Sequence, residues 1–187
     1  MSMTLQTSAQ VHSRQWKHVL HTTDDAFFKS SEARRIGDQL MLYQRVTGGW
    51  PKNIDMVSPL SDEERAKVLA DKQRIDDSTT DNDATNIQMR FLARLFHATH
   101  DKQVREAFCH AVEYLLSGQY DNGGWPQFWP NPHGYQVHIT YNDDAMVNTM
   151  LLLRDVAEAK APFEKALTTK ALRKQAQAAF EKGWSAS

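Results

Sequence analysis

Gly-Gly-Trp-Pro occurs twice in this chain, at residues 48–51 and again at residues 123–126, a 75-residue offset. An acidic segment follows each copy: Thr-Asp-Asn-Asp-Ala at residues 80–84, and Thr-Tyr-Asn-Asp-Asp-Ala at residues 140–145. The repeating unit is therefore a helix, a glycine turn with a Trp-Pro loop, an acidic cap and an inner helix. Units of this kind bury their apolar faces only by stacking on one another, which predicts a ring of helical hairpins.

Helical periodicity covers most of the chain. Apolar side chains recur at spacings of three and four residues over residues 31–45, 84–98 and 104–116. Residues 145–157 leave little room for a polar face, which predicts a central helix that is buried on most sides. Ser61 and Glu64 form a capping box, which begins a charged helix that reaches to about residue 74. Pro162 is expected in the first turn of a last helix. Because no clear strand alternation separates these segments, the predicted fold class is all-α, with residues 1–187 as a single domain.

Composition excludes several classes of function. The chain has 187 residues, of which 41% are hydrophobic and 24% charged, with a formal net charge of −1. These values are typical neither of a disordered chain nor of a polycation that binds nucleic acid. No stretch reaches the roughly 20 continuous apolar residues that cross a bilayer, so no membrane partner is expected. The chain begins with polar residues where a signal peptide needs an apolar run.

The two acidic segments offer hard oxygen donors, namely Asp81, Asn82, Asp83, Asn142, Asp143 and Asp144. A ring of hairpins brings both segments to one rim, together with the two Trp-Pro loops, and so forms a cleft. Carboxylates from two loops suit Ca²⁺ better than zinc or copper. The same residues are also ordinary helix N-caps, because Asp and Asn accept hydrogen bonds from free N–H groups there. The spacing by itself leaves both interpretations open.

The tryptophans also allow two interpretations. Trp50, Trp125 and Trp129 are either platforms for stacking sugars or large plugs beneath the glycine turns. Residues 123–135 hold three prolines, three glycines and four aromatic residues, which predicts a stiff, exposed loop of the kind that binding sites use. His138, just before the second acidic segment, is either a base or substrate donor, or a structural hydrogen-bonding residue.

Four motifs in order resemble the family 10 pectate lyases: GGWPKN at 48–53, TDNDAT at 80–85, NGGWPQFWP at 122–130 and HITYNDDAM at 138–146. The resemblance covers roughly residues 15–180. It implies an (α/α) toroid-like fold and cleavage of α-1,4-linked polygalacturonate by β-elimination, with Ca²⁺ as the cofactor. In that reaction a proton leaves C5, next to the C6 carboxylate, so that cations are needed to stabilise the negative charge that builds up.

The resemblance also implies roles for individual residues. Asp81 and Asp143 match acidic positions at the family's calcium and substrate site, and Asp144 is predicted as a further metal ligand. The predicted substrate-binding residues are Trp50, Lys52, Asn82, Trp125, Gln127 and His138. The family's catalytic base is an arginine well beyond the second acidic motif, and it has no counterpart among these 187 residues. The resemblance therefore implies a ring that is incomplete on its C-terminal side.

Two other functions remain compatible with these residues. A galacturonan-binding module without activity would keep the aromatic loops and lack the base. An inverting glycosidase on a related helical ring would use two of the aspartates as acid and base. Because polygalacturonate lies in plant cell walls, the resemblance implies a secreted or periplasmic protein. An incomplete ring is also expected to expose inner apolar residues, such as 150–153.

Overall fold

The computed structural model describes residues 15–131 and 144–186. In chain order, its elements are a helical segment over residues 15–20, α2 (Asp25–Phe28), α3 (Ser31–Tyr43), α4 (Asp62–Asp71), η1 (Asp81–Asp83), α5 (Asn86–Thr99), α6 (Lys102–Ser117), α7 (Ala145–Glu158), η4 (Lys165–Leu167) and α8 (Lys170–Ala186). No strand occurs in these two ranges, which contain only isolated β-bridges. The predicted all-α class is confirmed.

The helix ends follow local capping chemistry. The capping box at the start of α4 is present, because Ser61 Oγ accepts from the Glu64 amide and Glu64 Oε2 accepts from the Ser61 amide. The expectation for Pro162 is wrong, since this residue lies in a turn before η4. The last helix begins later, at Lys170, where Thr169 Oγ1 accepts from the Leu172 amide at 3.1 Å. A threonine N-cap therefore sets this helix start.

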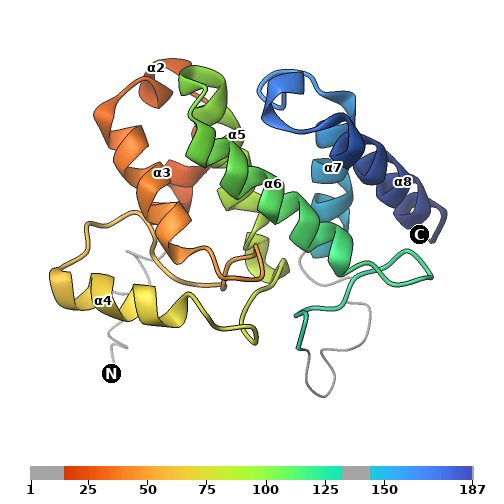
Figure 1. Cartoon of the computed structure of the whole chain (residues 1–187), viewed down its shortest axis with the longest axis horizontal. Coiled ribbons are helices and arrows are strands. Elements are labelled where there is room, and N and C mark those ends of the chain that lie inside the picture. Colours follow the sequence, from red (N-terminus) through yellow and green to blue (C-terminus); the bar gives the residue numbers. More distant parts are fainter. Residues whose placement is uncertain (1–14, 132–143, 187) are drawn as a thin grey trace, which may run out of the picture.

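The helices form two layers, with α3, α6 and α8 in one layer and α5 and α7 in the other. Helices α3, α6 and α8 lie side by side and run in a similar direction across the molecule (Figure 1). Helix α5 packs on α3 and α6, and α7 packs on α5 and α8. Two hairpins, α5–α6 and α7–α8, thus follow each other around an arc, as the repeat predicts. Helix α4 contacts α3 outside this double layer.

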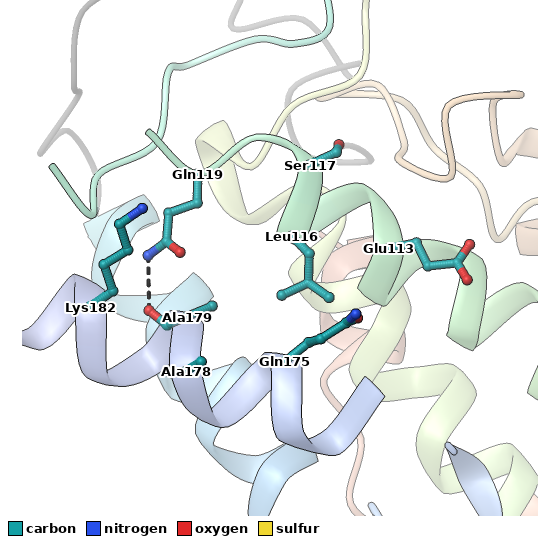
Figure 2. Close-up of a pocket in the computed structure, with 8 residues that line it drawn as sticks. All are labelled: Glu113, Leu116, Ser117, Gln119, Gln175, Ala178, Ala179 and Lys182. Atoms are coloured by element: carbon teal, nitrogen blue, oxygen red, sulfur yellow. Dashed lines mark hydrogen bonds between the residues drawn. The ribbon is translucent and has the colours of Figure 1, made fainter. Parts of the chain in front are cut away.

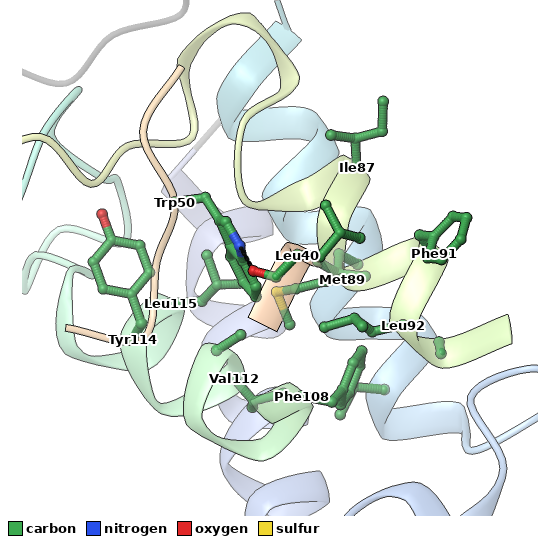
Figure 3. Packing of buried hydrophobic residues seen from close by; sticks show 14 of the residues in the cluster. Leu40, Trp50, Ile87, Met89, Phe91, Leu92, Phe108, Val112, Tyr114 and Leu115 are labelled. Atoms are coloured by element: carbon green, nitrogen blue, oxygen red, sulfur yellow. Dashed lines mark hydrogen bonds between the residues drawn. The ribbon is translucent and has the colours of Figure 1, made fainter. Parts of the chain in front are cut away.

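The core lies between the two layers. Figure 3 shows Trp50 and Leu40 packed against side chains of α5 and α6, including Met89 and Leu115. Helix α7 is buried in the same way, because α8 covers it. Three of the four residues at 150–153, which were expected to be exposed, are buried, with exposed fractions of 4% or less. That expectation is therefore wrong for the described part of the arc.

The sequence repeat is also a repeat of hydrogen bonds. The indole Nε1 of Trp50 donates to Leu40 O at 2.8 Å, and that of Trp125 donates to Leu115 O at 2.8 Å. In both copies the acceptor lies ten residues earlier, near the end of an outer helix. The tryptophan thereby supplies a partner to a carbonyl group in the last turns of that helix.

A glutamine in each copy ties the glycine turn to the next outer helix. Gln44 Nε2 donates to Gly48 O and to Ala107 O of α6, both at 2.9 Å. Its counterpart, Gln119, donates to Gly123 O at 2.9 Å and to Ala179 O of α8 at 2.8 Å. The two loops therefore connect α3 to α6 and α6 to α8 with the same chemistry.

We expect Gln44→Ala to lower the free energy of unfolding by about 1–3 kcal/mol, because it removes two hydrogen bonds from a nearly buried amide. Urea unfolding followed by circular dichroism measures the change. Gln73→Ala is the matched control, since Gln73 is exposed. Equal stability of the two variants would contradict the structural role of Gln44.

Candidate functional site

Three loops meet at Thr79. The Thr79 amide donates to Trp50 O at 3.1 Å, and its hydroxyl donates to Gln127 O. The loop that precedes α5 closes on the same point, because Thr85 Oγ1 donates to Thr79 O at 2.8 Å and accepts from the Trp50 amide at 3.0 Å. The two Trp-Pro loops and the first acidic segment are thus held together, as a ring-like arrangement predicts.

Asp81 lies at the centre of this junction. Its carboxylate Oδ2 is paired with the ammonium of Lys52 and accepts from Gln127 Nε2 at 2.6 Å. Lys52 and Gln127 each follow a repeat tryptophan by two residues, so equivalent positions of the two loops converge on one carboxylate. Asp81 and Gln127 are 4% and 9% exposed, whereas the Lys52 side chain is 29% exposed. The cluster therefore presents a partly accessible cation.

The environment keeps Asp81 ionised. Burial by itself raises the pKa of this carboxyl group, because it disfavours the charged form. The hydrogen bonds from Lys52 and Gln127 and the charge of Lys52 outweigh burial, so the pKa lies below its ordinary value. Asp81 is a carboxylate acceptor at neutral pH and does not supply a proton there.

The segment that carries Asp81 has an unusual backbone. Asn82, Asp83 and Thr85 have φ values of 51°, 68° and 64°. Asn and Asp tolerate this region, but a β-branched residue such as Thr85 rarely adopts it. The Thr85 hydroxyl makes the two buried hydrogen bonds described above, which hold it in place. Strained residues of this kind gather at functional sites.

Two neighbours of the cluster were not predicted from the sequence. Phe128 lies beneath Lys52, with the ammonium 5.3 Å from the ring centroid. Asn53 Oδ1 accepts from the Asn82 side-chain amide at 3.3 Å, which places the predicted substrate contact Asn82 beside the cluster. Phe128 directly follows Gln127, and Asn53 directly follows Lys52, within the two motifs that contain Gly-Gly-Trp-Pro. This adjacency to predicted site residues was the sequence signal by which both could have been found.

The described end of the second acidic segment, Asp144 and Ala145, lies next to the Asp81 cluster. A small cavity of about 10 Å³ is lined by Asp81 and Gln127 on one side and by Ala145 and Met146, the first residues of α7, on the other. Asp144 directly precedes them and is exposed. The start of α7 thus faces the Asp81 cluster. His138 and Asp143 lie outside the described residues.

The predicted metal ligands do not form a calcium site within the described residues. In residues 15–131 and 144–186, no group of three or more His, Cys, Asp or Glu side chains is arranged to hold a metal ion. The oxygens of Asp81 are already engaged, Oδ2 by Lys52 and Gln127 and Oδ1 by the Asn82 amide at 3.0 Å. Ca²⁺ needs six to eight oxygen ligands, which this donor set does not provide by itself.

The tryptophans require a correction. Trp50 and Trp125, predicted to bind substrate, are 0% and 2% exposed, and Trp129 is 4% exposed. Trp129 stacks on Tyr114, with ring centroids 4.3 Å apart, and donates its indole N–H to Tyr114 O. Buried rings offer no face to a sugar. All three tryptophans are structural plugs that support the loops from below.

A wider groove lies on the outside of the molecule, between α6 and α8 (Figure 2). It has a volume of about 510 Å³, and its lining includes Leu116, Ala178 and Lys182. The hydrogen bond from Gln119 to Ala179 O crosses it. Among the described residues, none of those predicted to act on substrate lines this groove, so the candidate site is the loop junction around Asp81.

No helix of the part of the chain that the structure describes is both long and apolar enough to cross a bilayer.

Two solved structures of a polysaccharide lyase are similar to this chain. The chain resembles the family 10 polysaccharide lyase from Cellvibrio cellulosa, with 27% identity and a TM-score of 0.69 over 98% of this chain. An Asp-to-Ala variant of that lyase, in complex with trigalacturonic acid, matches with 28% identity and a TM-score of 0.72 over 95% of this chain. In both cases the chain spans 50% of the length of the solved structure.

Among curated proteins, no significant sequence match is found. The family model for pectic acid lyase matches residues 44–186, which is most of the chain. Both the Asp81 cluster and the two Gly-Gly-Trp-Pro loops lie within this matched region. The chain therefore belongs to the pectic acid lyase family, and its fold is that of the family 10 polysaccharide lyases.

Proposed function

We propose that this chain acts as a pectate lyase, cleaving α-1,4-linked polygalacturonate by calcium-assisted β-elimination. The convergence of Lys52 and Gln127 on the Asp81 carboxylate carries the proposal, because it presents a cation at a junction of loops in a lyase fold. A galacturonan chain carries one carboxylate on each sugar. A secreted or periplasmic location follows from the plant cell-wall substrate.

Lys52 is the residue that we assign to the substrate carboxylate. Its side chain is 29% exposed and is oriented from two directions, by Asp81 and by the ring of Phe128. A positioned cation stabilises the charge that builds up on the C6 carboxylate when the C5 proton is removed. Gln127 and Asp81 act as orienting partners in this arrangement, and Asn82 is a second substrate contact.

Calcium remains a proposal for the complex with substrate. Substrate carboxylates are hard oxygen donors of the type that Ca²⁺ prefers, and Asp143 and Asp144 are the residues that we propose to share it. The described residues do not form such a site alone, so no chemical step is assigned to the metal. When bound, it would act as a Lewis acid toward the substrate carboxylate.

Ultraviolet absorbance of the unsaturated product tests the activity directly. We expect the purified chain to form this product from polygalacturonate, which requires that a base other than the family's arginine accepts the C5 proton. We expect Lys52→Met to lower kcat/KM by about a hundredfold, the usual loss of one electrostatic contact. Lys67→Met removes the same charge from an exposed position on α4 and is expected to leave the rate unchanged.

The reaction product distinguishes the proposed lyase from the two alternative functions. Binding of polygalacturonate without product would indicate a galacturonan-binding module, and saturated reducing ends would indicate an inverting glycosidase. Either result would overturn the proposed lyase activity.

Removal of calcium provides a separate prediction. We expect EDTA to lower the rate at least about tenfold, because a Lewis acid contributes several kcal/mol of charge stabilisation, and added Ca²⁺ to restore it. The same absorbance assay measures both effects, with the calcium chelate of EDTA as the control for other effects of the chelator. An undiminished rate in EDTA would remove calcium from the mechanism.

The lowered pKa of Asp81 predicts that the stability of the fold depends on pH. Its pKa is lower in the folded protein, so its stabilising contribution is present above the unfolded pKa of about 3.9 and is lost as the pH falls toward the folded value. We expect Asp81→Asn to be less stable by about 1–3 kcal/mol at pH 6. Urea unfolding should show this difference shrinking below about pH 4, whereas a difference independent of pH would contradict the ionised role.

A further inference from the structure

The helical segment over residues 15–20 lies outside the region that matches the family model. Two of its side chains, Trp16 and Leu20, are 5% and 2% exposed and belong to the core cluster. Side chains four residues apart share one face of a helix. Lys17 and His21 form a second pair with the same spacing. Because Trp16 and Leu20 are anchored in the core, they also set the positions of Lys17 and His21, which each follow one of them by one residue.

Lys17 and His21 contact the two residues that directly follow Asp81 in the first acidic segment, Asn82 and Asp83. Lys17 Nζ donates to Asn82 O at 2.8 Å, across 65 residues of sequence. His21 Nε2 lies 3.1 Å from Asp83 Oδ2. Lys17 is half-buried, and its ammonium makes a charge-assisted hydrogen bond, which is stronger than one between neutral groups.

These contacts fall on residues whose backbone needs support. Asn82 and Asp83 both have positive φ, and such conformations persist where the surroundings over-determine them. Asn82 is held from both sides: its N–H donates to Asp81 Oδ1 at 3.0 Å, and its carbonyl accepts from Lys17. A shift of Asn82 would therefore turn the carboxylate that orients Lys52 and Gln127.

We propose that Lys17 is a positioning residue for the polygalacturonate site. Its ammonium holds the Asn82 carbonyl and so keeps the Asp81 carboxylate directed at Lys52 and Gln127, while His21 supports the segment through Asp83. The effect on ligand binding rests on the function proposed above. The effect on the loop does not depend on that function.

Hydrogen exchange measures the loop without any ligand. We expect Lys17→Met to accelerate amide exchange in the peptide covering residues 79–86 by about tenfold, the equivalent of one lost charge-assisted hydrogen bond. Lys17→Arg retains a donor and is expected to restore most of the protection. Lys29→Met removes the same charge from an exposed position after α2 and should leave this peptide unchanged.

Calorimetric titration with trigalacturonic acid measures the consequence for binding. We expect Lys17→Met to weaken the affinity about tenfold at a temperature where the variant is fully folded, with recovery in Lys17→Arg. Because the ligand is an anion, any lost positive charge near the site lowers affinity somewhat. Lys29→Met calibrates that general effect, which should stay below about twofold at physiological salt.

The two measurements separate the possible failures. Unchanged exchange in residues 79–86 of Lys17→Met, or equal changes in Lys29→Met, would overturn the positioning role. If the wild-type chain does not bind trigalacturonic acid, the proposed function fails, while exchange still decides the role of Lys17. If Lys17→Met does not fold, His21→Gln takes its place, with faster exchange around Asp83 as the expected result.

Discussion

The burial of a tryptophan under each glycine turn is the constraint on which the rest of the structure depends. An indole ring is buried only if its N–H finds an acceptor, and here the acceptor is a carbonyl of the preceding outer helix, Leu40 O or Leu115 O. This bond fixes the direction in which the chain leaves the helix. As a result, the residues two positions later, Lys52 and Gln127, point to the same rim and meet at Asp81.

The site combines a rigid frame with a strained segment. Thr79 and Thr85 bind the three loops to one another through buried hydrogen bonds, so the frame has little freedom. Within it, Asn82 and Asp83 adopt left-handed conformations that no regular helix start requires. The frame therefore holds a backbone that the isolated segment would avoid, and the orientation of the Asp81 carboxylate follows from it.

Electrostatics give the junction its chemical character. A buried carboxylate is costly unless it is paired, and Lys52 and Gln127 provide the pairing for Asp81. The cation remains partly accessible, which suits a polyanionic substrate, although the chain has a net charge of only −1. In the function proposed above, recognition of an acidic polymer depends on where single cations are placed, because no overall positive charge attracts the polymer.

Much of the fold was determined by the sequence itself. Periodic apolar residues set the helices, the capping box set the start of α4, and the repeat of Gly-Gly-Trp-Pro predicted stacked hairpins with loops on one rim. Four predicted site residues, Asp81, Asn82, Lys52 and Gln127, come together there. Only the tertiary structure decided that the tryptophans are buried plugs and that Lys17 reaches Asn82. Burial and contacts across 65 residues depend on how helices pack, and local sequence patterns do not encode that packing.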